Sequence, residues 1–344
     1  MESGGTGRHS GKGMGGDFVI VSKQTLLDEA AAAGFRAEIL EKVFYLLALL
    51  TGISKHPFLK ERVVLTGGTA LNLFMFDLPR LSVDIDLNYI GSVDPDKMKA
   101  ERPRLLKAIA AVCKREGLAI DHVKDDRHAA TKFLLRYTSP LGRGGNLKID
   151  LLYMYRIALW PITKRKSVQI GTQSQIDFPV QDIHELAGGK LKALLSRKAS
   201  RDLFDAHLLF NEGDLEQDKL RLAFVVYGAM AMSDKDWREI KTTDVDFTKE
   251  DLDDQLIPVL RRKNLKDLGD REEWARKLVN ETRESLNRLL PLTSPEKEFL
   301  DRLFDHGEIE PRILTQDEEM VERISQHPNL KWQAQKVEKY KLKK

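Results

Sequence analysis

Cysteine is almost missing from this chain of 344 residues, which contains only Cys113. A single cysteine excludes an internal disulfide and any zinc site built from cysteines. With that cysteine usage, a cytoplasmic location is the default expectation. Cys113 lies in the pattern LLKAIAAVCKREG, which is typical of a buried helix position, so we do not expect it to be catalytic.

Long apolar runs are also missing. No stretch approaches the roughly 18 apolar residues that a membrane-spanning helix requires, so we expect no membrane association. The N-terminal segment MESGGTGRHSGKGMGG is rich in glycine and lacks the apolar region of a secretory signal. We predict a disordered leader over residues 1–21; an expression remnant or an early start codon before Met14 is the alternative.

Neither sign of charge is in large excess. Lysine and arginine number 56 and the acidic residues 53, which gives a net charge of +3. This balance permits a nucleic-acid partner but does not require one. The pattern GxxxxGK[ST] does not occur, which argues against a Walker-type NTPase.

The patterns that are present divide the chain in two. Strand-like runs lie before Pro179, and helical patterns dominate after it. We therefore predict an α+β fold, with a mixed sheet flanked by helices over residues 22–180 and a mostly helical domain over residues 181–344. A helix is predicted over residues 94–116, with a break at Pro103.

A glycine pair follows a short β-branched run over residues 63–65, and residues 70–76 after it look helical. Without a Cβ, Gly67 and Gly68 let the backbone approach phosphate oxygens closely, and the start of a helix favours anions. Thr69 adds a hydroxyl donor. These three residues are candidate phosphate ligands, although an ordinary strand-to-helix turn would also explain the glycines.

The next strand-like run, over residues 80–89, carries two aspartates. Polar residues alternate there with apolar ones: Ser82, Asp84, Asp86 and Asn88. Period two places Asp84 and Asp86 on one face, where they can share Mg²⁺ (or Mn²⁺) with the phosphates of a nucleoside triphosphate. Two such metal ions would hold the attacking and leaving oxygens at the α-phosphorus. An exposed polar face would explain the pair alone, but the preceding glycine turn favours a metal site.

A third aspartate lies on a predicted strand over residues 146–155, which a glycine-rich turn joins to a strand over residues 131–138. Asp150 is flanked by apolar residues, and a carboxylate on a central strand requires a metal or a cation as partner. It is a candidate third metal ligand, or the base that accepts a proton from the attacking hydroxyl. A salt bridge to Lys148 or Arg136 is the alternative.

Together, LTGGTALNLF and RLSVDIDLNYIG resemble the nucleotidyltransferase AbiEii/AbiGii toxin family of the DNA polymerase β-like nucleotidyltransferase superfamily. The resemblance continues through ELAGGKLKAL and RKASRDLFD, so that it spans about residues 65–210. It implies a polymerase β-like nucleotidyltransferase core whose active site is completed by the helical domain.

The resemblance also implies a function. Such an enzyme belongs to a toxin–antitoxin or phage-defence system and transfers a nucleotide from an NTP to an acceptor, for some members the 3′ end of tRNA, which blocks translation. An antitoxin encoded by the adjacent gene is the implied partner. Carried over by position, Asp84 and Asp86 bind metal, Ser82 lies beside the phosphates, Lys190 contacts the triphosphate and Asp202 is a further essential acid. A positive charge at Lys190 suits a pyrophosphate leaving group, although a solvated helix lysine is the alternative.

Asn72 stands where some family members have a basic residue, which leaves the nucleotide preference open. Two other functions also stay open: a protein or small molecule could be the acceptor, or the chain could be a non-catalytic nucleotide-binding module. A basic cluster near the predicted site could guide an RNA backbone; it comprises Lys190, Lys192, Arg197, Lys198 and Arg201.

Overall fold

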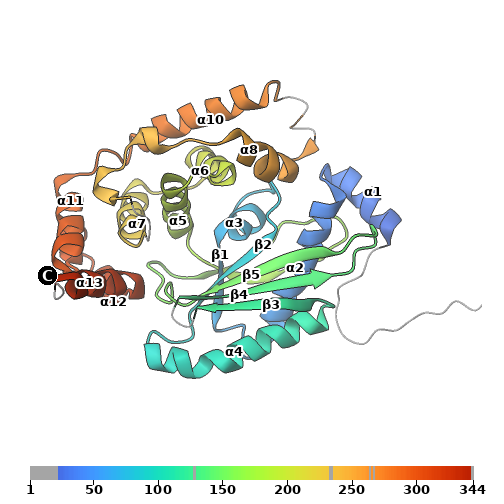
Figure 1. The fold of residues 1–344 in the computed structure, drawn as a ribbon, viewed down its shortest axis with the longest axis horizontal. Helices are drawn as coiled ribbons and strands as arrows, with labels where there is room; N and C mark the ends of the chain where they lie inside the picture. Colours follow the sequence, from blue (N-terminus) through green and yellow to red (C-terminus); the bar gives the residue numbers. More distant parts are fainter. Residues whose placement is uncertain (1–21, 127–128, 232–234, 263–264, 266–267, 342–344) are drawn as a thin grey trace, which may run out of the picture.

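The computed structural model describes residues 22–126, 129–231, 235–262, 265 and 268–341, so the predicted leader over residues 1–21 lies outside the described residues. These residues form a mixed seven-stranded sheet with the strand order β3-β4-β5-β2-β1-β7-β6 (Figure 1). The strands are β1 (Val63–Thr66), β2 (Asp84–Tyr89), β3 (Ala119–Asp126), β4 (Ala130–Tyr137), β5 (Gly145–Leu152), β6 (Thr163–Lys166) and β7 (Asp177–Val180).

One face of the sheet is apolar and is covered by the helices α2 (Ala37–Lys55) and α4 (Pro95–Arg115). The predicted break at Pro103 is wrong, because α4 runs through it. Met98 and Leu105 are buried on either side of Pro103, and their packing holds the two turns in line despite the missing amide hydrogen bond.

The other face is covered over only part of its width. Figure 1 shows α3, α5 and α6 on the side of the sheet opposite α4. The strands β3 and β4 remain uncovered there, because β3 is exposed throughout and alternate residues of β4 are exposed. The helix α3 (Gly67–Ala70) packs on β1 and β2 and continues into the π-helical turn η1 (Leu71–Met75). Next to them lies α5 (Ile183–Ser196), on which α6 (Ser200–Glu212) and α7 (Gln217–Ala229) pack.

The remainder of the chain is helical, as predicted. Its buried apolar side chains belong to the same connected core as those of the first half, which runs from Leu26 to Ala334. The division into two domains at residue 180 stays a prediction. In the part of the chain that the structure describes, no helix is long and apolar enough to span a lipid bilayer. The remaining elements are α1 (Lys23–Ala33), η2 (Trp237–Glu239), η3 (Thr242–Asp244), α8 (Lys249–Asp251), η4 (Leu252–Leu256), η5 (Ile257–Val259), α10 (Arg271–Leu286), α11 (Ser294–Asp301), η6 (Arg302–His306), η7 (Pro311–Ile313), α12 (Glu318–Gln326) and α13 (Pro328–Lys341).

The α+β prediction is confirmed, and so is the hairpin of β4 and β5. The strand predicted from Arg80 begins only at Asp84, because the residues before it pair with the helical half instead of the sheet. Arg80 forms an isolated bridge with Leu260, and the Leu81 amide donates to the Val259 carbonyl at 2.9 Å.

Candidate active site

Three carboxylates lie on the partly covered face of the sheet. Asp84 and Asp86 project from the same side of β2, and β5 runs parallel to β2 with Asp150 in register beside Asp86. Parallel pairing therefore brings together residues that are more than sixty positions apart in the sequence. The three predicted acids form one cluster.

A lysine lies within this cluster. The Lys148 ammonium group is 3.8 Å from Asp84 Oδ2 and 3.3 Å from Asp150 Oδ2. The salt bridge considered from the sequence is thus present for Lys148. The other candidate partner, Arg136, instead pairs with Asp121 at 2.9 Å.

The carboxylates fit a divalent cation by their chemistry. Burial, together with the negative charges of Asp150 and Asp84, raises the pKa of Asp86 to about 6. Asp150 Oδ1 is buried and has no hydrogen-bond partner among the residues that the structure describes. Negative charge crowds Asp86 despite the nearby lysine, and one oxygen of Asp150 has no partner, so both carboxylates would gain from a bound cation. Hard oxygen ligands of this kind suit Mg²⁺ or Mn²⁺. Within the described ranges, no three acidic, histidine or cysteine side chains already surround one metal position.

The glycine turn lies directly against this cluster. Gly67 has a φ of +72°, and a Cβ at this position would lie 2.3 Å from Asp86 Oδ2, so only glycine fits. The Thr69 hydroxyl is fully buried and donates to the carbonyl oxygen of Asp84 at 2.5 Å. Thr69 therefore fixes the turn to β2. Its hydroxyl is not available as the phosphate donor that we predicted.

Three side-chain donors gather over Gly68. A Cβ on Gly68 would lie 2.9 Å from Arg80 Nη2, 3.0 Å from Ser82 Oγ and 3.7 Å from Lys190 Nζ. These groups pack so closely against Gly68 that even a methyl side chain would force Arg80 or Ser82 to move, and they place two cationic groups and a hydroxyl beside the turn. Such a convergence of donors at the start of a helix suits an anionic oxygen.

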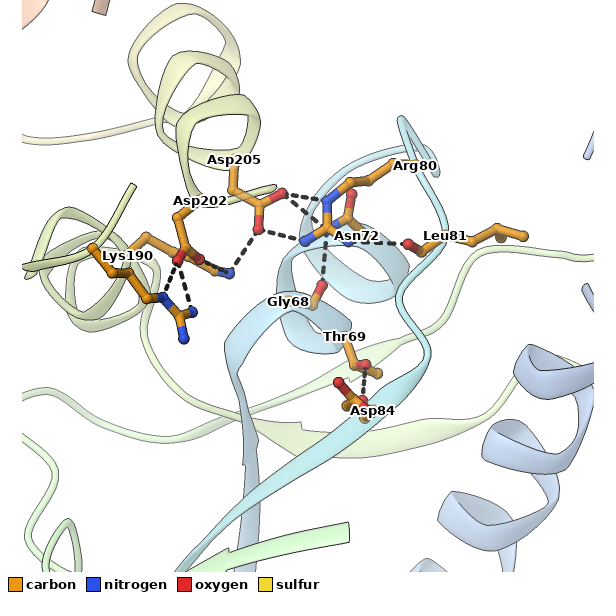
Figure 2. Close-up of polar contacts among 10 residues, drawn as sticks. Gly68, Thr69, Asn72, Arg80, Leu81, Asp84, Lys190, Asp202 and Asp205 are labelled. Carbon is orange, nitrogen blue, oxygen red and sulfur yellow. Dashed lines mark hydrogen bonds and ion pairs between the residues drawn. The ribbon is translucent and has the colours of Figure 1, made fainter. Parts of the chain in front are cut away.

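A buried ion cluster holds two of these donors in place (Figure 2). Arg80 donates twice to Asp205, at 2.7 and 2.6 Å, and Lys190 Nζ lies 2.7 Å from Asp205 and 3.1 Å from Asp202. Arg197 donates to Asp202 at 2.7 Å. Burial alone would raise the pKa of Asp205, but the charges of Arg80 and Lys190 hold it far below its usual value.

Arg80 and Asp205 were not selected from the sequence as site residues, although both occur in the segments that carry the family resemblance. A weak signal was present, because Asp202 and Asp205 are three residues apart on one helix and so share a face. Asn72, noted as a departure from some family members, is also buried here, and its amide donates to the Gly68 carbonyl at 2.9 Å.

A cavity of about 200 Å³ opens beside the glycine turn, between the sheet and α5. Of the predicted basic cluster, Lys190, Lys192 and Arg197 line it, whereas Lys198 pairs with Asp246 at 3.0 Å. The other lining residues include Gly67, Gly68, Asp86, Asn88, Tyr155, Gln181, Glu185, Asp202 and Tyr227.

The chain is similar to known proteins in sequence and in fold. Residues 48–306 match the family model described as nucleotidyl transferase AbiEii toxin, type IV toxin–antitoxin system. No curated protein matches the chain. Among solved structures, the chain is similar to the nucleotidyltransferase toxin MenT4 from Mycobacterium tuberculosis H37Rv, with a TM-score of 0.54 and 14% identity over 88% of this chain and 98% of that one. At this identity the likeness shows a shared fold.

Proposed function

Since this chain belongs to the AbiEii nucleotidyltransferase toxin family of type IV toxin–antitoxin systems, we propose that it transfers a nucleoside monophosphate from an NTP to the 3′ end of an RNA, most readily tRNA, and thereby blocks translation. The observation that carries the proposal is the cluster of Asp84, Asp86 and Asp150 beside a glycine turn that gathers cationic donors. Carboxylates for a cation and donors for phosphates are the two parts that nucleotidyl transfer requires.

The residues divide the chemistry between them. The Gly68 turn and Lys190 bind the phosphates and neutralise the charge that develops on the leaving pyrophosphate. The acceptor hydroxyl attacks the α-phosphorus, the new O–P bond forms, and the bond to the α,β-bridging oxygen breaks. Asp150, whose carboxylate lies in register beside Asp86, accepts the hydroxyl proton. Asp84, Asp86 and Asp150 would hold Mg²⁺ or Mn²⁺, which supplies Lewis-acid polarisation of the phosphates when bound.

An open basic surface supports RNA as the acceptor. Lys124 on β3 is in register with Lys132 on β4, which in turn is in register with Asp150. Lys132 Nζ lies 3.5 Å from Asp150 Oδ2, so the surface reaches the carboxylates. Leu134 on the same face is 41% exposed. Cationic side chains around an exposed apolar one suit a nucleic-acid strand, whose backbone is anionic and whose bases are flat.

The family also implies an antitoxin as partner. We propose that the adjacent gene encodes it, that the pair acts in the cytoplasm, and that it contributes to phage defence. A small regulator encoded directly upstream would support this setting.

A transfer assay tests the proposed acceptor. The purified protein is incubated with Mg²⁺, each of the four α-labelled NTPs in turn, and either total RNA or an RNA-free protein extract. Label is expected on RNA, removable by RNase and resistant to protease. Label that survives RNase and is lost on protease treatment would show a protein acceptor and overturn the RNA proposal. NTP binding without any transfer would instead show a non-catalytic binding module.

A further inference from the structure

The cavity beside Lys190 has an aromatic end. Tyr155 and Tyr227 both line it, and their rings stack with centroids 5.8 Å apart and an angle of 23° between the planes. Tyr227 is buried, whereas Tyr155 is partly exposed. A tyrosine ring that packs on a second ring and remains partly open to a cavity offers a surface on which a flat base can stack.

The Tyr155 side chain is fixed by its neighbours. Lys192 Nζ donates to its hydroxyl at 2.6 Å and lies 5.0 Å from its ring centroid. The ring of His327 meets it edge-on, with centroids 5.9 Å apart and an angle of 71°. A side chain held in this way loses little further conformational freedom when a ligand packs against it, which favours binding.

Part of this support comes from beyond the region that the family model matches, residues 48–306. His327 follows α12 directly. On α12 itself, Arg323 donates to the carbonyl oxygens of Ala158 and Leu159 at 3.3 and 2.8 Å, in the loop that carries Tyr155. The C-terminal helices therefore hold the aromatic end of the cavity in shape.

An unpartnered amide also lines this cavity. Asn88 lies on β2, two residues after Asp86 and on the same face, and it is only 2% exposed. Its Oδ1 has no hydrogen-bond partner within the described residues. A buried amide oxygen without a donor is unfavourable, and the edge of a nucleobase carries N–H groups that would satisfy it.

We propose that this end of the cavity is a nucleobase subsite, in which Tyr155 stacks on the base and Asn88 bonds to its edge. The inference rests on the proposed function, because the phosphates of the same NTP are placed at Gly68 and Lys190. The terminal base at the 3′ end of an RNA could also stack on Tyr155. The base of the NTP is the favoured occupant, because Lys190, which binds the triphosphate in the proposed function, lines the same cavity.

Calorimetric titration without RNA tests the subsite. Wild-type protein with Mg²⁺ is titrated with each NTP and with inorganic tripolyphosphate, which has the phosphates but no base. At least one NTP should bind more tightly than tripolyphosphate. Tyr155→Ala should lower the affinity for that NTP by roughly 5- to 150-fold, which is the contribution expected from stacking of one base on an aromatic ring. The affinity for tripolyphosphate should stay unchanged. Tyr155→Phe should keep most of the NTP affinity, as should Trp332→Ala, which removes an exposed aromatic side chain from α13.

Equal affinity of wild-type protein for tripolyphosphate and for every NTP would overturn the subsite, and this comparison does not depend on the folding of any variant. A folded Tyr155→Ala protein with unchanged NTP affinity would overturn it as well. Weaker NTP binding by folded His327→Ala, with tripolyphosphate unaffected, would support the role of the C-terminal helices, and unchanged binding would contradict it. If the wild-type protein transferred nucleotides but bound every NTP no more tightly than tripolyphosphate, the proposed function would stand and the subsite would be refuted. If the wild-type protein bound no NTP at all, both would be refuted.

Discussion

Replacing Asp205 by asparagine removes one charge from the buried ion cluster behind the glycine turn while keeping the shape of the side chain. Asp205 and Arg80 have side chains that are 0% and 3% exposed and share two hydrogen bonds of 2.7 and 2.6 Å. Removing one partner of a buried pair typically costs about 3–5 kcal/mol, because the other charge stays buried without compensation. We expect a loss of this size in the free energy of unfolding at pH 7.

The loss should depend on pH. Because the folded-state pKa of Asp205 lies below its unfolded value of 3.8, its ionised form stabilises the fold above that value. This contribution disappears as the pH falls through the folded-state pKa. The difference between wild-type protein and Asp205→Asn should therefore be full at pH 7 and become smaller below pH 4.

Urea unfolding followed by circular dichroism measures this difference in the free energy of unfolding. The unfolding midpoints of two proteins can be compared when their free energies of unfolding depend on urea concentration with similar slopes. Glu318→Gln is the matched control. Arg312 donates twice to Glu318, both times at 2.6 Å, but the two side chains are 52% and 72% exposed. The control should lose far less stability than Asp205→Asn, because water and salt screen an exposed ion pair. A double replacement, Arg80→Met with Asp205→Leu, should recover part of the stability that Asp205→Asn loses. If Asp205→Asn and Glu318→Gln were equally stable, the reasoning from burial would be refuted.

Three further predictions follow from individual contacts. Gly68→Ala places a methyl group 2.9 Å from Arg80 Nη2 and 3.0 Å from Ser82 Oγ, so NTP affinity measured by calorimetry should fall by roughly 5- to 150-fold; unchanged affinity would argue against a phosphate site at this turn. Burial raises the pKa of Glu185 to about 7. The protonated carboxyl group therefore contributes its full stabilisation of the fold below pH 4.5, and this contribution is lost as the pH rises through 7. Between pH 5 and 8, the free energy of unfolding of the wild-type protein should therefore fall relative to that of Glu185→Gln by at most about 3 kcal/mol, and a constant difference in urea titrations would count against this assignment. Lys124→Glu should weaken RNA binding and lower its salt dependence without changing NTP affinity; equal RNA affinity in filter-binding assays would remove β3 from the acceptor surface.

The sequence could predict the features that depend on local periodicity. Alternation in β2 was sufficient to place Asp84 and Asp86 on one face, and the apolar neighbours of Asp150 marked a strand that crosses the core. The helical character of the second half followed from its 3.6-residue pattern. Each of these features is determined within a window of a few residues.

Features that depend on distant pairing could not be predicted in this way. Arg80 and Asp205 are 125 residues apart, and neither pattern around them indicates the other. The strand β3 was missed because its sequence, AIDHVKDD, is exposed throughout and lacks apolar alternation; it is held by pairing with β4. The aromatic end of the cavity joins Tyr155, Tyr227 and His327 from three separate segments.

The most direct test of the account is transfer by Asp86→Asn. The replacement keeps size and hydrogen-bonding capacity but removes a carboxylate whose pKa burial raises to about 6, so the fold should be at least as stable as the wild type at pH 7.5. With saturating Mg²⁺, labelled NTP and RNA, single-turnover transfer should fall by at least about a hundredfold. Asp121→Asn, in which the acid removed pairs with Arg136 outside the carboxylate cluster, should keep the wild-type rate. Wild-type transfer by a folded Asp86→Asn protein would contradict the central claim that these carboxylates carry the reaction.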